Sequence, residues 1–157
     1  MVVLRKAKID DAQSIKELIE PYAENEVMLS RPIYEIYENI RDFSVADIKG
    51  KIVACGSLHV FGKEYKSRKG KEPVLAEIRS LAVARDWQGK KIGTGIVKNL
   101  VQDGKALGIT KIFALILKNN LGFLKGYGSE KLIKRECRRK SGRSASGAQG
   151  FHLTATK

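Results

Sequence analysis

The stretch AEIRSLAVARDWQGKKIGTGIVKNL, residues 76–100, decides the fold of this chain. Its apolar run at residues 78–83 is typical of a buried strand. A turn with glycines at 89, 93 and 95 follows, and the apolar-periodic residues 96–107 after it predict a helix. A strand, a glycine turn and a helix in this order present backbone N–H groups and a helix N-terminus to a phosphate. We therefore predict a site for an anionic, phosphate-bearing ligand at this turn.

Two common phosphate-binding turns do not fit these residues. The mononucleotide loop G-x-x-x-x-G-K-[ST] needs a longer interval than the one between Gly89 and Gly93. The dinucleotide pattern G-x-G-x-x-G also fails, because Gly93 and Gly95 are followed by Lys98 where the third glycine should stand. The turn must therefore be of another kind.

The turn resembles the pyrophosphate turn of the GNAT acyltransferases, which has the form [Q/R]-x-x-G-x-[G/A]. Gln88 and Gly93 fit the first and last positions, and Lys91 occupies the place of the usual middle glycine. The resemblance implies an α/β (α+β) fold, with a mixed central sheet splayed around a CoA slot and flanked by helices. It also implies acetyl-CoA as cosubstrate and no metal. The cofactor-binding residues that it implies are Leu81, Ala82, Val83, Gln88, Gly89, Lys90, Lys91, Ile92, Gly93, Thr94 and Asn120.

A closer resemblance extends over roughly residues 4–115. EIRSLAV followed by QGK-x-IG, with LSRP at residues 29–32 and YENIRDF at residues 37–43, is similar to the short, stand-alone amino-acid N-acetyltransferases of the N-acetylglutamate synthase type. This implies transfer of an acetyl group from acetyl-CoA to the α-amine of an amino acid, with L-glutamate as the expected acceptor. In that role the protein would serve arginine biosynthesis in the cytoplasm.

Glu77 and Tyr127 are the predicted catalytic residues. Glu77 lies on the strand that corresponds to the splayed strand of the GNAT family. In that family a bulge separates this strand from its neighbour, and a carboxylate there often accepts the proton of the attacking amine. Such a group is needed because an ammonium ion has no lone pair. Residues after 117 can be aligned with the family pattern N-x-x-A-x-x-[FL]-Y, in which Asn120 and Tyr127 fit, and Tyr127 would reprotonate the CoA thiolate. The alternative for Glu77 is an ion pair with a lysine.

The predicted acceptor-binding residues are Arg41, Arg79 and Ser80. Glutamate carries two carboxylates, which guanidinium groups bind in bidentate fashion. Arg41 could instead compensate a helix C-terminus, and Arg79 could form an ordinary ion pair across the sheet. His59 is interpreted as a strand residue rather than a base, and Cys55 as a core residue.

The chain has 157 residues, enough for one domain with its own core. Its hydrophobic fraction of 43% and charged fraction of 30% are typical of a soluble globular protein. No apolar run approaches the ~20 residues that span a bilayer, and the N-terminus shows no signal-peptide pattern. The two cysteines, Cys55 and Cys137, favour a reducing cytosol over a disulfide framework or a zinc site.

The net charge of +13 is unevenly distributed. From Lys125 onward, nine lysines and arginines accompany Glu130 and Glu136, so this part carries +7 of the +13. Nucleic acid is therefore not the expected partner of the motif-bearing residues. We predict a GNAT domain over residues 1–137 and a basic, Ser/Gly-rich tail over 138–157. This tail is divergent or disordered and does not look like the last two strands of such a fold.

The remaining elements follow from periodicity and turn signals. Residues 62–73 are polar and glycine-bearing, and they predict a loop or a hairpin tip. The expected strands lie at residues 2–8, 43–48, 52–60 and 111–117, and the expected helices run from residue 10 or 11 past 22 and from 32 to about 40.

Two other functions remain open from the sequence. One is a GNAT enzyme with a different acceptor, such as glutamine, another amino acid or a protein amine. The other is a non-catalytic remnant that binds CoA or nucleic acid. The expected partners are the amino-acid substrate and acetyl-CoA, without a membrane, and the sequence leaves a homodimer open.

Overall fold

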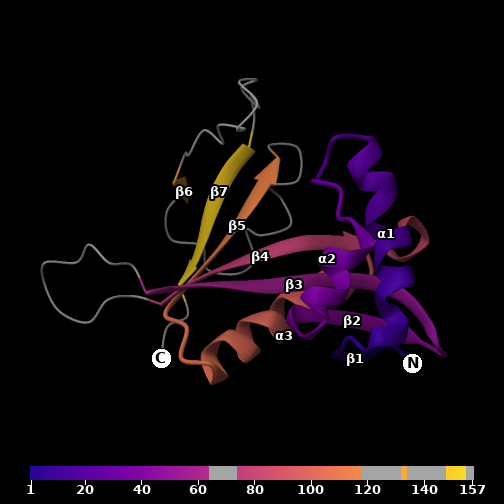
Figure 1. The fold of residues 1–157 in the computed structure, drawn as a ribbon, viewed down its shortest axis with the longest axis horizontal. Coiled ribbons are helices and arrows are strands. Elements are labelled where there is room, and N and C mark those ends of the chain that lie inside the picture. Colours follow the sequence, from indigo (N-terminus) through magenta and orange to yellow (C-terminus); the bar gives the residue numbers. More distant parts are fainter. Residues whose placement is uncertain (64–73, 118–131, 134–147, 155–157) are drawn as a thin grey trace, which may run out of the picture. The chain divides into compact units, whose positions relative to one another are not determined.

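The computed structural model describes residues 1–63, 74–117, 132–133 and 148–154 of the chain (Figure 1). The chain divides into two compact units. The first unit comprises Met1–His59 and Ile78–Asp103, and the second comprises Val60–Glu77 and Gly104–Lys157. Each unit is described separately below.

Four neighbouring strands, in the order β1-β2-β3-β4, contribute to the sheet of the first unit. They are β1 (Val3–Lys6), β2 (Phe43–Ile48), β3 (Lys51–Lys63) through its residues 51–59, and β4 (Val74–Val83) through its residues 78–83. The pairs β1/β2 and β2/β3 are antiparallel, and Val45 faces Cys55 in the register of the second pair. The turn between β2 and β3 has positive φ at Lys49 and Gly50, the geometry that suits a tight hairpin.

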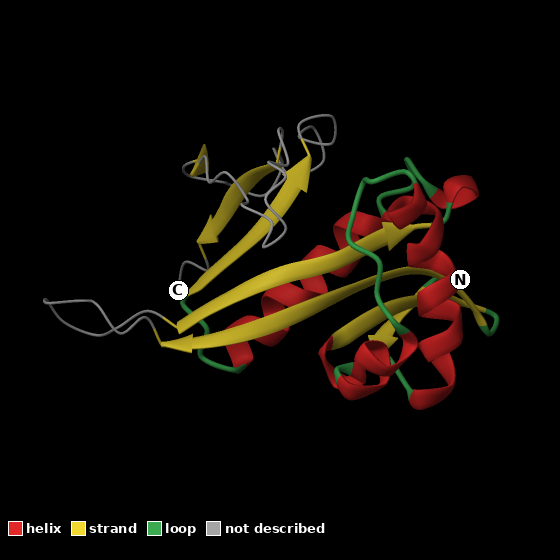
Figure 2. Cartoon of the chain, turned by 45° about the horizontal axis from the view of Figure 1, so that its top comes forward, coloured by secondary structure: helices red, strands yellow, loops and turns green. Residues whose placement is uncertain are grey.

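Helices cover both faces of this sheet (Figure 2). On one face, α1 (Ala12–Glu24) and α2 (Ile33–Glu38) contribute apolar side chains that form one core with side chains of β2, β3 and β4. The apolar side chains of α1 recur at helical spacing, and Ile15 and Ile19 are fully buried. The buried members of this core are Ala12, Ile15, Ile19, Ile36, Ile40, Phe43, Val45, Ile52, Cys55 and Ala82.

The long helix α3 (Ile92–Ala106) packs on the other face through its part in the first unit, residues 92–103. Gly56 marks the contact: a Cβ there would lie only 2.9 Å from Cγ2 of Ile96. Gly56 and Cys55 are adjacent in β3, so they point to opposite faces of the sheet. The Asn99 side chain donates a hydrogen bond to Ser44 Oγ at 3.2 Å and adds a second link from α3 to the sheet.

An ion-pair network connects β1, β2 and the start of α1. The Arg5 guanidinium on β1 binds Asp11 at 2.6 Å and Asp47 at 2.8 Å. The Asp11 carboxylate also accepts a hydrogen bond from the Lys8 backbone N–H at 2.7 Å. Asp11 is buried, and its hydrogen bond from Arg5 lowers the pKa of its carboxyl group below the usual value.

The described strands of the second unit that follow α3 are β5 (Lys111–Leu117), β6 (Leu132–Ile133) and β7 (Ala148–Thr154), in the order β5-β7-β6. Both pairs are antiparallel, with Lys111 opposite Thr154 at one end of the β5/β7 ladder. In the same unit, the rings of Phe61 and Phe113 stack with their centroids 5.8 Å apart.

The structure corrects the sequence interpretation of the tail at one segment. Residues 148–154 were expected in a divergent or disordered tail, and they form β7 with seven residues in register with β5. The segment AQGFHLT lacks the apolar alternation of a typical strand. The segment forms a strand because its backbone pairs with β5, a tertiary contact that the side-chain pattern of residues 148–154 does not predict.

Candidate functional site

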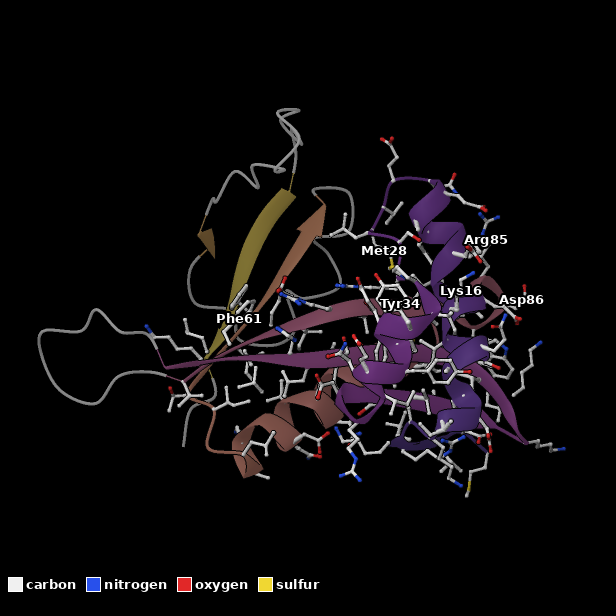
Figure 3. The ribbon with its side chains drawn as sticks, viewed as in Figure 1. Lys16, Met28, Tyr34, Phe61, Arg85 and Asp86 are labelled. Carbon is white, nitrogen blue, oxygen red and sulfur yellow. The ribbon has the colours of Figure 1, made fainter. Side chains whose placement is uncertain are left out.

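The predicted phosphate turn lies where β4 leads into α3. After β4 ends at Val83, a short 3-10 helix, Arg85–Trp87, carries the exposed side chains of Arg85 and Asp86 (Figure 3). The turn then passes through Gly89 and Lys91, both with positive φ, and α3 begins at Ile92. The predicted cofactor-binding residues from 88 to 94 are thus contiguous around the N-terminus of a 15-residue helix.

Lys91 has a left-handed backbone with φ 61°. L-residues with a side chain disfavour this region by about 1 kcal/mol, whereas glycine adopts it readily. The geometry explains why a glycine would suit this position. In this chain the turn keeps the left-handed conformation and adds an exposed lysine at the N-terminus of α3.

The Gln88 side chain makes hydrogen bonds within the protein. Its Nε2 donates to the Tyr22 hydroxyl at 2.7 Å and to the Val83 carbonyl at 3.3 Å. The Tyr22 hydroxyl in turn donates to the same Val83 carbonyl. The Tyr22–Val83 hydrogen bond joins residues 61 apart in the chain, so the sequence contains no local signal for it.

Lys90 and Trp87 form a cation–π contact beside the turn. The Lys90 Nζ lies 4.5 Å from the centroid of the Trp87 ring. An aromatic face attracts an ammonium group at this distance. The contact restricts the Lys90 side chain to the Trp87 side of the turn.

A small pocket with a cavity volume of about 60 Å³, widely open to solvent, lies within the first unit. Its wall contains two guanidinium groups, two carboxylates, an imidazole and smaller polar side chains around two apolar residues. The lining residues are Arg31, Glu35, Ile36, Asn39, Asp42, Phe43, Ser57, His59, Arg79 and Ser80. This mixture of charged and polar groups suits a small, polar ligand with more than one charged group.

The β4 side of the pocket has an irregular backbone. Ser80 has φ 51°, a left-handed conformation inside a strand, which interrupts a regular ladder. The Ser57 hydroxyl lies 3.3 Å from the Arg79 carbonyl, and Cys55 Sγ lies 3.5 Å from the Ser80 carbonyl, so side chains of β3 bond to this part of β4. Cys55 itself is a core residue, and burial raises the pKa of its thiol to about 12.

The structure brings together some of the predicted acceptor residues and not others. Arg79 and Ser80 line the pocket. Arg41 is exposed and is not among the lining residues. Arg31, which lies just before the start of α2 at Ile33, lines the pocket together with Arg79. Arg31 stands in the LSRP block of the resemblance, and that block was the available signal for it.

The other predicted residues have different positions. His59 lies in β3, as interpreted, and it also lines the pocket. Glu77 is buried in β4, with 7% of its surface exposed, two residues before Arg79. Asn120 and Tyr127 lie outside the described residues, so their roles stay predictions. Leu81, Ala82 and Val83 form the last part of β4.

A model of the acetyltransferase (GNAT) family matches residues 12–128, most of the chain. The chain belongs to the GNAT acetyltransferase family. The expected GNAT fold and the acyltransferase class are thereby confirmed, and acetyl-CoA is the cosubstrate expected of a member. Within the described ranges, no helix is long and apolar enough to cross a membrane. Among the same residues, no three His, Cys, Asp or Glu side chains gather as metal ligands would.

Two similar proteins and one similar crystal structure illustrate this family relationship. The uncharacterised N-acetyltransferase CT2212 of Chlorobaculum tepidum is 35% identical over 131 residues, which are 83% of this chain and 77% of that protein. An amino-acid acetyltransferase of Mycobacterium tuberculosis is 34% identical over 72% of this chain and 60% of its own length. A crystal structure of Rv2747 from Mycobacterium tuberculosis in complex with CoA and NLQ matches with a TM-score of 0.76 and 26% identity. That match covers 97% of this chain and 98% of the other.

Proposed function

We propose that this protein transfers the acetyl group of acetyl-CoA to the α-amine of an amino acid, with L-glutamate as the first expected acceptor. The product would be N-acetylglutamate, as in arginine biosynthesis, and the reaction would take place in the cytoplasm. The observation that carries the proposal is the pair of guanidinium groups, Arg31 and Arg79, in one pocket. Relatives named amino-acid acetyltransferases support the same class of acceptor.

Acceptor recognition follows from the chemistry of the pocket wall. A guanidinium group binds a carboxylate through two parallel hydrogen bonds, which fixes both the position and the plane of the ligand. Arg31 and Arg79 could each bind one carboxylate of a dicarboxylic amino acid. Arg41, which is exposed, stays a second prediction for the same role.

The CoA end of the reaction is assigned to the turn between β4 and α3. Backbone N–H groups of residues 88–94 and the N-terminus of α3 would bind the pyrophosphate. Lys90 and Lys91 would add positive charge there. The backbone of Leu81, Ala82 and Val83 in β4 would hold the pantetheine arm, and Asn120 is the further cofactor contact that the family pattern implies.

The chemistry would be a direct transfer. The neutral amine attacks the thioester carbonyl carbon, a C–N bond forms, and the C–S bond breaks to release the CoA thiolate. Glu77, which is buried in β4, is the proposed acceptor of the amine proton. Tyr127 is the proposed donor to the departing thiolate.

The experiment is a measurement of CoA release from acetyl-CoA with each of the twenty amino acids. Turnover with glutamate, alone or together with glutamine, would support the proposal. Turnover with glutamine alone, another amino acid alone or a protein amine would favour the alternative acceptor. Binding of acetyl-CoA without turnover on any acceptor would favour the non-catalytic remnant, and salt-sensitive nucleic-acid binding would strengthen that alternative.

A further inference from the structure

An ion pair inside the pocket wall is the starting observation. Arg31 Nη1 lies 3.1 Å from Glu35 Oε2, and both residues line the pocket. Their side chains are 25% and 35% exposed, respectively, so both charges are partly removed from water. The Arg31 guanidinium group, which is proposed to bind the acceptor, is therefore already paired with a carboxylate.

The backbone holds Glu35 in this place independently of its side chain. The Glu35 N–H donates to the Pro32 carbonyl at 3.1 Å. The Glu35 carbonyl accepts hydrogen bonds from the Asn39 N–H at 3.1 Å and from the Asn39 side-chain amide at 2.8 Å. These contacts lie within α2 and its two caps, Pro32 and Asn39, so a change confined to the Glu35 side chain leaves them in place.

The charges of the pocket wall are balanced. Arg31 and Arg79 contribute two positive charges, and Glu35 and Asp42 contribute two negative charges. The sum of these four charges is zero. An acceptor with two carboxylates and a neutral, reactive amine brings a double negative charge into this wall, whereas an acceptor with an amide side chain brings one.

We propose that Glu35 is a specificity-determining residue that lowers the preference of the pocket for a carboxylate over an amide in the acceptor side chain. The inference rests on the proposed function. A side-chain carboxylate near Arg31 is repelled by the Glu35 carboxylate and must compete with it for the guanidinium group. A side-chain amide can accept from Arg31 and donate to Glu35 at the same time.

The test compares glutamate with glutamine as acceptors for the protein and its Glu35→Gln variant. The measured quantity is kcat/KM for glutamate divided by kcat/KM for glutamine, obtained from CoA release. We expect the ratio to rise about tenfold in Glu35→Gln. This fold-change corresponds to an interaction energy between the values for two unit charges a few ångströms apart in water and at a protein surface. The variant keeps the size of the side chain and removes only its charge.

Glu38→Gln is the matched control. Glu38 lies on the same helix, is exposed and does not line the pocket, and the substitution makes the same change in net charge. It should leave the ratio unchanged. An equal rise in Glu38→Gln would assign the effect to the general charge of the protein and would overturn the role of Glu35.

The remaining outcomes separate this inference from the function on which it rests. If both amino acids are turned over and the ratio in Glu35→Gln is unchanged or lower, only the role of Glu35 is overturned. Turnover of neither amino acid by the unsubstituted protein overturns both. If Glu35→Gln has no turnover, calorimetric titration of glutamate and glutamine into the CoA-bound protein supplies the same ratio from the two dissociation constants.

Discussion

The Tyr22 hydroxyl on α1 donates a hydrogen bond to the carbonyl oxygen of Val83, the last residue of β4. Gln88 Nε2 donates to both of these oxygens, so the three residues form one hydrogen-bonded cluster. The cluster ties α1 to the start of the turn that leads into α3. Tyr22 thus acts as a positioning residue for the proposed pyrophosphate site, which it reaches through Gln88.

Tyr22→Phe should raise KM for acetyl-CoA several-fold and leave kcat nearly unchanged. The substitution removes the hydroxyl that orients Gln88 and keeps the ring in the core. We expect a loss of about 1 kcal/mol in the free energy of unfolding from the lost hydrogen bonds. Steady-state kinetics at varied acetyl-CoA, together with urea unfolding, measure both effects. Tyr34→Phe, at a residue 60% exposed on α2, is the control, and an unaltered KM in Tyr22→Phe would refute the positioning role.

Lys91→Gly should stabilise the protein. Lys91 has φ 61°, which a glycine adopts without the steric cost of a side chain. The gain is reduced because glycine also has more freedom in the unfolded chain, which leaves roughly 0.5 kcal/mol. Thermal unfolding measures it. Lys90→Gly should instead lower the stability, since Lys90 is not among the left-handed residues and would lose its contact with Trp87. A lower melting temperature for Lys91→Gly would contradict this account.

Gly56→Ala should destabilise the packing of α3 on the sheet by about 1–3 kcal/mol. The added methyl group would lie 2.9 Å from Ile96 Cγ2 and 3.2 Å from Leu100 Cδ1, closer than carbon atoms normally approach. Ile96→Ala removes the nearer atom, so the double variant should lose less stability than the two single losses combined. Chemical unfolding of all four proteins tests this, and strictly additive losses would show that the two positions are not in contact.

The Arg5 network should make stability sensitive to acid. Hydrogen bonds from Arg5 lower the pKa of both Asp11 and Asp47. A carboxylate with a lowered pKa in the folded state stabilises the fold above its unfolded pKa of about 3.9. That contribution is lost as the pH falls through the lower, folded pKa.

Arg5→Gln should therefore cost about 2 kcal/mol at pH 7, and its deficit relative to the unsubstituted protein should shrink as the pH is lowered toward 3. Urea unfolding at pH 7, 4 and 3 measures the deficit. Lys16→Gln, which disrupts only the 3.4 Å pair with Glu20 on α1, should show a small deficit at pH 7. A deficit for Arg5→Gln that does not change with pH would rule out the carboxylates as its source.

Glu77→Gln should lower kcat by roughly 10²–10⁴-fold and leave the KM for acetyl-CoA unchanged, because it removes the proposed proton acceptor. The expected loss is in the chemical step, and binding of CoA to the turn does not involve this side chain in the proposal. Kinetics and CoA titration separate the two quantities. Glu38→Gln, an exposed site, should behave as the unsubstituted protein. Full activity in Glu77→Gln would remove Glu77 from the mechanism.

Contiguous features could be predicted from the sequence. The strand predicted at residues 43–48 is β2 with the same bounds, and the strand at 111–117 is β5. Helix ends were predicted less accurately. Helix α3 begins at Ile92, four residues before the predicted start, and α2 ends at Glu38 instead of at about residue 40. The early start of α3 follows the left-handed Lys91, a conformation that a lysine does not signal.

The turn between β4 and α3 belongs to what the sequence by itself determined, because its residues are contiguous and Gly89 marks a position of positive φ. The pocket was decided only by the tertiary structure. Arg31, Ser57 and Arg79 come together there from three segments, each more than 20 residues from the next. Helical and strand periodicity indicate which face of a helix or strand is buried. They do not indicate which other element, distant in the sequence, packs against that face. For that reason the sequence predicted Arg41 as an acceptor residue, whereas the structure places Arg31 in the pocket wall with Arg79.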